Sequence, residues 1–297
     1  KNIREQGLKS VTEVMDLLGW ETVGCEKCRP AINYYVSMVD PLHAVDDISS
    51  RLVNERTHAN IQADGTFSVV PRMYGGVVSA EELKRIAEAA VKYDVPLVKV
   101  TGGQRIDLLG VKKDDLPKMW KDIDMPSGFA YAKGLRTVKT CVGEKYCRYG
   151  TRDSLGLGVR MERFFEGLWM PAKVKMAVTG CPRNCAESLI KDLGVVGING
   201  GFEIYVGGSG GIVLKGGKLL CTVETSEEVL QTAASFMQFY REDAEYGERT
   251  YKWVRRVGLE VIKDTLAKDG VGLAERLNDA RDVVKEPWGV GVKASGE

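Results

Sequence analysis

Hydrophobic residues recur at the spacing of an amphipathic helix in several segments of the chain. Residues 79–93 carry apolar side chains three or four positions apart, and Ser79 and Glu82 form a capping-box pattern at the start. A short capped helix is expected over 8–18 in the same way. Further helices are expected over 114–122, 155–168, 226–241 and 250–267.

Other segments show the patterns of β-strands. Val174, Met176 and Val178 alternate with less apolar residues, which predicts a strand that is buried on one face. Residues 95–100 form a short, mostly apolar run and are expected to be a buried strand. Additional short strands are expected at 67–70, 194–198, 202–206 and 212–214. Helices and strands in this order predict an α+β fold.

The length and charge of the chain narrow the class of protein. A chain of 297 residues is long enough for two or three domains. The formal net charge of +1 gives no reason to expect nucleic acid or a membrane as a partner. No apolar run approaches the ~20 residues of a membrane-spanning helix, and the polar start is unlike a signal peptide. We therefore expect a cytoplasmic protein, in which clustered cysteines more often bind metal than form disulfides.

Four of the seven cysteines fall into two closely spaced pairs. Cys141 and Cys147 stand as C-x5-C, and Cys181 and Cys185 stand as C-x3-C. Ligation by four thiolates suits zinc or an iron–sulfur cluster. The C-x3-C spacing lies within the usual range for zinc ligands, whereas C-x5-C lies outside it. The spacing therefore favours iron–sulfur and leaves zinc open.

Basic residues adjoin both cysteine pairs. Lys173 and Lys175 lie on one face of the strand that leads into the Cys181 loop, because side chains on a strand alternate with a period of two. Arg148 directly follows Cys147. A cluster of cations beside thiolates suggests a site for a small oxyanion and for a carboxylate-rich cofactor. The alternative is that the two lysines lie on a solvated face.

Taken together, these motifs resemble the signature of the sirohaem-containing nitrite and sulfite reductases. The resemblance rests on Thr140-Cys141-x5-Cys147-Arg148, on Lys173-Val-Lys175 and on the run TGCPRNC over 179–185. Within that family, the run RFFEGLWMPAK over 163–173 resembles the large subunits of NAD(P)H-dependent assimilatory nitrite reductases. The resemblance covers about residues 60–290.

The resemblance implies a definite arrangement of cofactors and ligands. The four cysteines would bind one [4Fe–4S] cluster, and Cys185 would also bridge to the sirohaem iron. The substrate anion would be lined by Arg72, Arg148, Lys173 and Lys175. Sirohaem would be held by Thr101, Gln104, Arg105, Thr140, Asn184, Gly207 and Gly208.

By this resemblance, two glycine-containing loops, at 101–105 and 207–211, are expected to contact the cofactor. The family usually shows T-x-R-Q where this chain has Thr101-Gly102-Gly103-Gln104, so Arg105 is expected to replace the missing arginine. The glycine run 207–211 is expected either to turn a hairpin or to offer backbone N–H groups to cofactor carboxylates.

Cys25 and Cys28 resemble the end of a small [2Fe–2S] domain of the bacterioferritin-associated-ferredoxin type. Such a domain needs four cysteines, so the resemblance implies that the chain is the C-terminal portion of a longer enzyme. FAD and NAD(P)H would bind to an upstream electron-donor module of that enzyme, and a small Rieske-type subunit is a further expected partner. The alternatives for the two cysteines are an isolated thiol pair or half of a zinc site.

The expected organisation therefore has three parts. Residues 1–40 would be the [2Fe–2S] remnant, residues 41–132 a ferredoxin-like half-domain, and residues 133–297 a mixed-sheet domain for sirohaem and [4Fe–4S]. The implied activity is the six-electron reduction of nitrite to ammonia. One alternative is sulfite reduction by the same residues, and another is a non-catalytic, metal-stabilised electron-relay domain. Cys221 lies in an apolar strand setting and is expected to be an inert core thiol.

Overall fold

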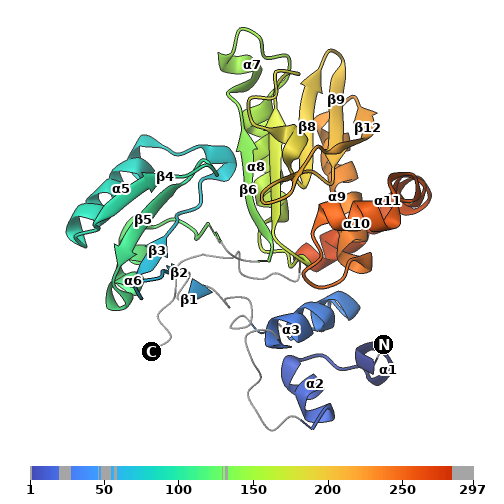
Figure 1. Ribbon diagram of the computed structural model, residues 1–297, viewed down its shortest axis with the longest axis horizontal. Helices are drawn as coiled ribbons and strands as arrows, with labels where there is room; N and C mark the ends of the chain where they lie inside the picture. The colour runs from blue at the N-terminus through green and yellow to red at the C-terminus, as the bar shows by residue number, and fades with distance from the viewer. Residues whose placement is uncertain are drawn as a thin grey trace.

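Two separate hydrophobic cores organise the protein. The computed structural model describes residues 2–19, 28–45, 47, 55–56, 59–128, 130 and 133–282. Each core packs against its own five-stranded sheet, and the two sheets form two lobes that stand side by side (Figure 1). The predicted α+β fold is confirmed.

The smaller lobe is an antiparallel sheet with helices on one face. Its strand order is β1-β2-β3-β5-β4. The strands are β1 (Glu55–Arg56), β2 (Ala59–Ile61), β3 (Phe67–Val69), β4 (Leu97–Val100) and β5 (Ile106–Val111). The helical elements are η1 (Tyr74–Gly76), α5 (Ala80–Lys92), η2 (Lys113–Asp115) and α6 (Leu116–Ile123).

Two sequence predictions for this lobe have opposite outcomes. The helix predicted over 79–93 is confirmed as α5, and its capping box forms in full between Ser79 and Glu82. The prediction that 95–100 is a buried strand is wrong, because β4 is an edge strand that pairs only with β5 and every one of its residues is exposed. A short apolar run alone cannot tell a central strand from an edge strand.

The larger lobe contains a mixed sheet in the order β12-β9-β8-β7-β6. Strands β6 (Leu135–Thr140), β7 (Val174–Thr179) and β8 (Leu193–Ile198) are parallel, whereas β9 (Gly201–Val206) and β12 (Lys218–Val223) run antiparallel to their neighbours. A small hairpin, β10 (Ser209–Gly210) with β11 (Leu214–Lys215), follows β9.

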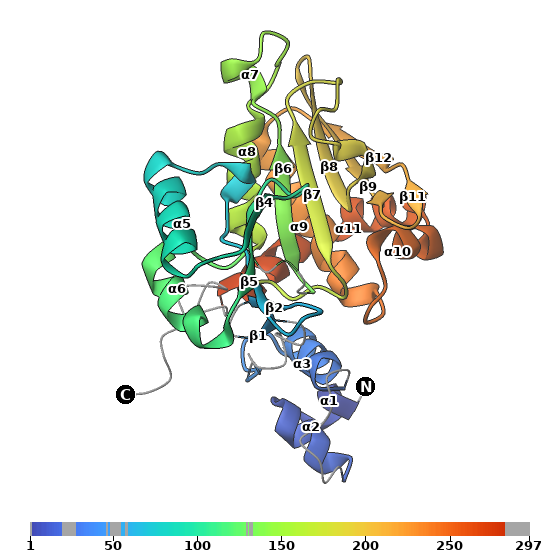
Figure 2. The same cartoon turned by 60° about the vertical axis from the view of Figure 1, so that its left-hand side comes forward.

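Helices of the larger lobe cover one face of its sheet (Figure 2). These helices are α8 (Ser154–Phe165), α9 (Ser226–Asp243) and α11 (Leu259–Asp282), while α7 (Gly143–Tyr146), η3 (Ser188–Ile190) and α10 (Thr250–Val257) lie at its margins. The helix predicted over 250–267 is in fact two helices, because Gly258 adopts a φ of 91° and ends α10 before α11 begins.

A buried network joins the two lobes. Arg72 from the smaller lobe forms an ion pair of 2.8 Å with Glu162 of α8, and both side chains are fully buried. The other carboxylate oxygen of Glu162 accepts the N–H groups of Gly75, at 2.8 Å, and Val138, at 3.2 Å. One carboxylate therefore ties η1, β6 and Arg72 together at the base of the site described below.

The N-terminal helices pack beside the larger lobe. They are α1 (Asn2–Gln6), α2 (Val11–Leu17) and α3 (Cys28–Val39). The buried hydroxyl of Tyr34 in α3 donates to the carbonyl oxygen of Arg241 in α9. Cys25 lies outside the described residues, so the [2Fe–2S] interpretation of its pair with Cys28 stays a prediction, as do the three domain limits. Among the helices that the structure describes, none combines the length and apolar character that crossing a membrane requires.

Candidate functional site

The sheet of the larger lobe brings the two cysteine pairs together. Cys141 follows the end of β6 and Cys181 follows the end of β7. These strands are parallel neighbours, with Thr140 paired to Val178, so their carboxyl ends lie at the same edge of the sheet. All four predicted ligands line one cavity of about 410 Å³, namely Cys141, Cys147, Cys181 and Cys185.

The loop between Cys141 and Cys147 depends on a glycine. Gly143 adopts a φ of +65°, and a Cβ at this position would stand 2.8 Å from the Ser154 hydroxyl oxygen. The Sγ atom of Cys141 accepts the N–H of Gly180 at 3.1 Å. The first cysteine loop is therefore packed against the start of α8 and the start of the second cysteine loop.

The four cysteines surround one cavity, as the ligands of a multi-atom [4Fe–4S] cluster do. A structural zinc ion would instead need four ligands that converge to about 2.3 Å from one point. Within the described ranges, no three His, Cys, Asp or Glu side chains are arranged to hold one metal ion.

A second cavity, of about 430 Å³, adjoins the first and is strongly basic. Consecutive residues line the two cavities: Gly103 and Lys139 face the basic one, whereas Gln104 and Thr140 face the cysteines. The basic side chains in its wall are Arg105, Arg136, Lys139, Lys173, Lys175, Lys191 and Arg249, against the acidic Asp107, Glu187 and Asp192. The excess of cations makes this cavity suited to anionic groups.

Lys173 and Lys175 both line the basic cavity, on the face that the alternation of β7 predicts. Partial burial, followed by the positive charge of Arg136, lowers the pKa of both ammonium groups. Arg249 contributes next for Lys173, and Lys173 itself for Lys175. An anion in the cavity would relieve this repulsion, but the side chain of Lys175 is exposed, so the anion role of the two lysines stays a prediction beside the solvated-face alternative.

Three predicted cofactor ligands come from the loop after β4. Thr101 lines the basic cavity, and its buried hydroxyl has no hydrogen-bond partner in the described part of the chain. Arg105 lines it as well and donates from Nη1 to the carbonyl oxygens of Gly128, at 2.6 Å, and Arg136, at 2.9 Å. Gln104 instead donates to and accepts from the backbone of Thr140, at 2.8 and 2.9 Å. Gln104 therefore fastens the loop to the end of β6.

Other predicted residues lie beside the cavities rather than in their walls. Arg72 is bound to Glu162, and the guanidinium of Arg148 lies 4.7 Å from the ring centroid of Tyr149. Neither belongs to the residues that line the basic cavity. Asn184 adopts a φ of +57° and accepts the N–H of Leu189, which stabilises the turn after Cys181. The roles predicted for these residues stay predictions.

The glycine run after β9 turns a hairpin, and part of the run also lines the basic cavity. Residues 209–210 and 214–215 pair as a hairpin, and Ser209, Gly210 and Gly211 line the basic cavity. Gly207 and Gly208 lie outside this lining, and a Cβ on Gly208 would stand 2.4 Å from the Lys191 carbonyl oxygen. The cofactor contact predicted for Gly207 and Gly208 therefore stays a prediction.

Sequence reasoning missed four cations of the basic cavity: Arg136, Lys139, Lys191 and Arg249. A signal was available for the first two, because β6 leads into Cys141 just as β7 leads into Cys181. No local pattern marks Arg249, which reaches the cavity from the start of α10, more than fifty residues after the last cysteine pair.

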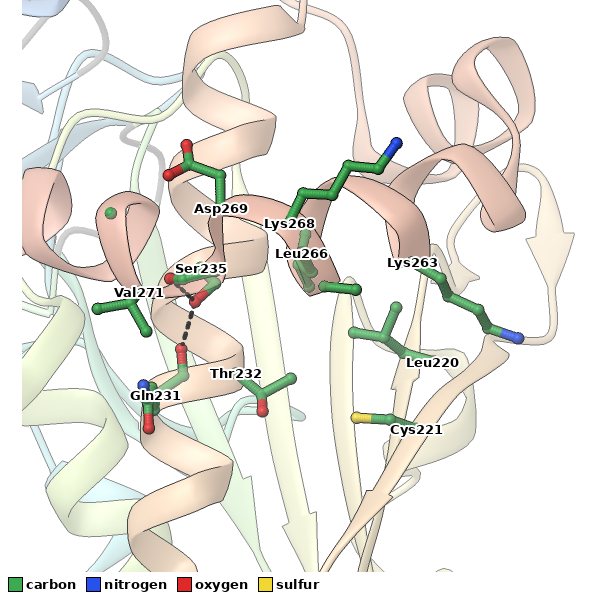
Figure 3. A pocket seen from close by; sticks show the side chains of 13 residues that line it. Leu220, Cys221, Gln231, Thr232, Ser235, Lys263, Leu266, Lys268, Asp269 and Val271 are labelled. Carbon is green, nitrogen blue, oxygen red and sulfur yellow. Dashed lines mark hydrogen bonds between the residues drawn. The ribbon is translucent and has the colours of Figure 1, made fainter.

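A third cavity, of about 650 Å³, lies between β12, α9 and α11 (Figure 3). It holds none of the predicted site residues. Cys221 lines it beside Thr232 and Lys263. Burial raises the pKa of the Cys221 thiol, which agrees with the prediction of an unreactive cysteine, although the residue lies at a cavity wall and not in the centre of the core.

Comparison with known families matches both lobes. Residues 131–271 match the nitrite and sulphite reductase 4Fe-4S domain, and residues 60–126 match the nitrite/sulfite reductase ferredoxin-like half domain. The structure of the Mycobacterium tuberculosis NirA protein superposes with a TM-score of 0.66 at 15% identity, covering 86% of this chain and 55% of that one, which supports the fold.

Two sequence relatives define the relationship more closely. The NAD(P)H nitrite reductase of Bacillus subtilis is 59% identical over 97% of this chain, which spans only 36% of that protein's length. An assimilatory-type sulfite reductase of Nitratidesulfovibrio vulgaris is 35% identical over 68% of this chain and 92% of its own length. The predicted pair of cofactors, sirohaem and [4Fe–4S], is confirmed at the level of the family. The chain therefore belongs to the nitrite and sulfite reductase family.

Proposed function

We propose that this chain is the part of an NAD(P)H-dependent nitrite reductase that reduces nitrite to ammonia. The observation that carries the proposal is the pair of adjoining cavities, one lined by four cysteines and the other by a ring of cations. The cysteines would hold the [4Fe–4S] cluster, and the basic cavity would take the carboxylates of sirohaem together with the substrate. When bound, the two cofactors would carry electrons from the donor to the substrate and provide the iron at which nitrite is reduced.

The side chains of the basic cavity would bind the anion and deliver protons. Lys173 and Lys175 stand in the same wall as Arg136, so a small anion placed there meets several charge-assisted donors. Because the pKa of each lysine is lowered, its ammonium group is a stronger acid than an exposed lysine. Lys173 and Lys175 would therefore donate protons to the departing oxygens, directly or through water, and Arg136 would hold the anion in place.

Nitrite is favoured over sulfite by the degree of similarity. Nitrite reductases of Bacillus subtilis and Emericella nidulans are 59% and 41% identical to this chain over nearly its whole length, against 35% for the sulfite reductase of Nitratidesulfovibrio vulgaris. The chain spans only about a quarter to a third of the nitrite reductases that it matches. An upstream module with [2Fe–2S], FAD and NAD(P)H, and a small Rieske-type subunit, are therefore part of the proposal as electron donors.

A cytoplasmic setting belongs to the same proposal, since cluster-binding cysteines must remain thiolates.

The test of the proposed function is a measurement of cofactor content followed by a comparison of two substrates. The purified chain should contain iron, acid-labile sulfide and chlorin-like visible absorption, and it should consume nitrite faster than sulfite with a chemical reductant. Stoichiometric zinc without visible absorption would refute the cofactor assignment, and a higher kcat/KM for sulfite would refute the substrate.

A further inference from the structure

Asp192 joins three parts of the wall of the basic cavity. Its side chain is 1% exposed. The carboxylate accepts the backbone N–H of Lys175 at 2.8 Å and the hydroxyl of Thr250, and Nη2 of Arg249 lies 3.0 and 3.1 Å from its two oxygens. One buried carboxylate thus fixes the start of the lysine strand β7 and the start of α10 relative to each other.

Arg249 uses only some of its N–H donors in hydrogen bonds to Asp192. The guanidinium carries five N–H donors, and both contacts to Asp192 come from Nη2. Its Nε atom is buried and has no acceptor among the residues that the structure describes. The side chain is 22% exposed and lines the basic cavity. A donor left without an acceptor beside a cavity is costly unless a ligand accepts from that group.

The charges around Arg249 point to an anion as that ligand. Arg249 lies close enough to Lys173 to lower the pKa of its ammonium group, after the larger effects of burial and Arg136. Asp192 raises the pKa of Lys173 and Lys175. Its carboxylate already accepts hydrogen bonds from Arg249, Lys175 and Thr250. Within the wall, Glu187 pairs with Lys139 and Lys191, and Asp192 pairs with Arg249, so its three carboxylates only partly balance its seven cations.

We propose that Arg249 is a further anion-binding residue of the basic cavity and that Asp192 is the positioning residue that holds its guanidinium there. The ligand is an oxyanion, which is either a carboxylate of the bound cofactor or the substrate anion. The identity of this ligand rests on the function proposed above, whereas the binding of an anion by Arg249 does not.

The main test compares Arg249→Gln with Arg255→Gln, a matched loss of charge on an exposed residue of the same helix. Cofactor per chain is measured from iron and visible absorption, and sulfite affinity from spectral titration of samples with equal cofactor content. Loss of cofactor alone identifies a cofactor carboxylate as the ligand. A sulfite affinity at least ~tenfold weaker at equal cofactor content, a change of about 1.4 kcal/mol, identifies the substrate anion as the ligand. Values equal to those of Arg255→Gln in both arms overturn the proposal.

A cofactor-free control separates this inference from the proposed function. Sulfate should raise the melting temperature of the unloaded parent chain and of Arg255→Gln more than that of Arg249→Gln. Arg249→Lys should recover part of the effect, because it keeps the charge but loses the planar fork. Equal shifts in all four proteins contradict the role of Arg249, even if the parent chain proves to lack sirohaem.

Asp192→Asn tests the positioning role by its effect on pH dependence. Asp192 raises the pKa of Lys173 and Lys175, against the lowering by burial, Arg136 and neighbouring cations, so its neutralisation should lower both pKa values further. Anion affinity should then begin to fall at a lower pH than in the parent. An unchanged pH profile in a folded Asp192→Asn protein would show that Asp192 is structural only.

Discussion

Replacement of Glu162 by glutamine should uncouple the two lobes. In the native protein one oxygen of this buried carboxylate binds Arg72 at 2.8 Å, and the other accepts the N–H groups of Gly75 and Val138. Glutamine supplies one oxygen and one NH₂ group in the same space. Whichever way the amide turns, an NH₂ group faces a donor, and the buried charge of Arg72 is left with the more distant carboxylate of Glu166, at 3.8 Å, as its counter-charge.

The expected loss of stability is large because both partners are fully buried. Removal of one member of a buried pair costs about 3–5 kcal/mol, since it leaves an uncompensated charge. Removal of one member of an exposed pair costs at most ~1 kcal/mol. Arg160 on the same helix provides that comparison, because its pair with Glu227 is 44% and 73% exposed.

The assay is urea unfolding followed by tryptophan fluorescence for the parent, Glu162→Gln and Arg160→Gln. Glu162→Gln should lose about 3 kcal/mol or more and Arg160→Gln less than ~1 kcal/mol. The double variant Arg72→Met, Glu162→Met should be more stable than Glu162→Gln, since it removes both members of the fully buried pair and leaves Glu166, which is 13% exposed and accepts the hydroxyl of Tyr74. A loss below ~1 kcal/mol for Glu162→Gln would refute the view that this ion pair ties the lobes together.

Three further predictions concern the cavities. Lys173→Met and Lys175→Met should keep the visible spectrum and lose at least ~tenfold in kcat/KM for nitrite, and near-parental turnover at equal cofactor content would contradict this. Cys185→Ser should lose the cluster and activity, whereas Cys221→Ser should keep both, as measured by iron and sulfide content. The lowered pKa of Lys173 and Lys175 predicts that anion affinity is highest at low pH and falls, as pH rises, before the pH reaches the ordinary lysine pKa. A sulfite affinity that stays constant up to that pH would contradict a site of charged lysines.

The cysteine cavity and the lysine face follow from local sequence patterns. Short spacings fix which cysteines share a loop, and the strand period of two fixes that Lys173 and Lys175 share a face. That the two loops meet depends on β6 and β7 being parallel neighbours, and no strand is among the expected elements over 135–140. The shared loops and the shared face could therefore be predicted from local patterns, whereas the pairing of β6 with β7 could not.

Features that depend on contacts between distant segments could not be predicted in this way. The exposure of β4 depends on its position at the edge of the sheet, and the run of apolar residues is the same whether a strand is central or not. Arg249 enters the basic cavity only because Asp192 binds it across 57 residues of sequence. The family resemblance implies that Arg72 lines the substrate anion, whereas its ion pair with Glu162 is a contact that no pattern in the sequence predicts.

The departure from the family pattern at Gly103 lies beside the side chain that is expected to compensate for it. A Cβ at Gly103 would make ordinary van der Waals contacts, at 3.4 Å with both Nε and Nη2 of Arg105 and at 3.7 Å with the Thr101 hydroxyl oxygen. The guanidinium of Arg105 therefore already lies beside position 103, and it lines the basic cavity from two positions along. Its Nη1 atom donates to the carbonyl oxygens of Gly128 and Arg136, which hold the guanidinium in this position. Arg105 is thus placed to supply the positive charge that the family has at 103, and its contact with the cofactor stays a prediction.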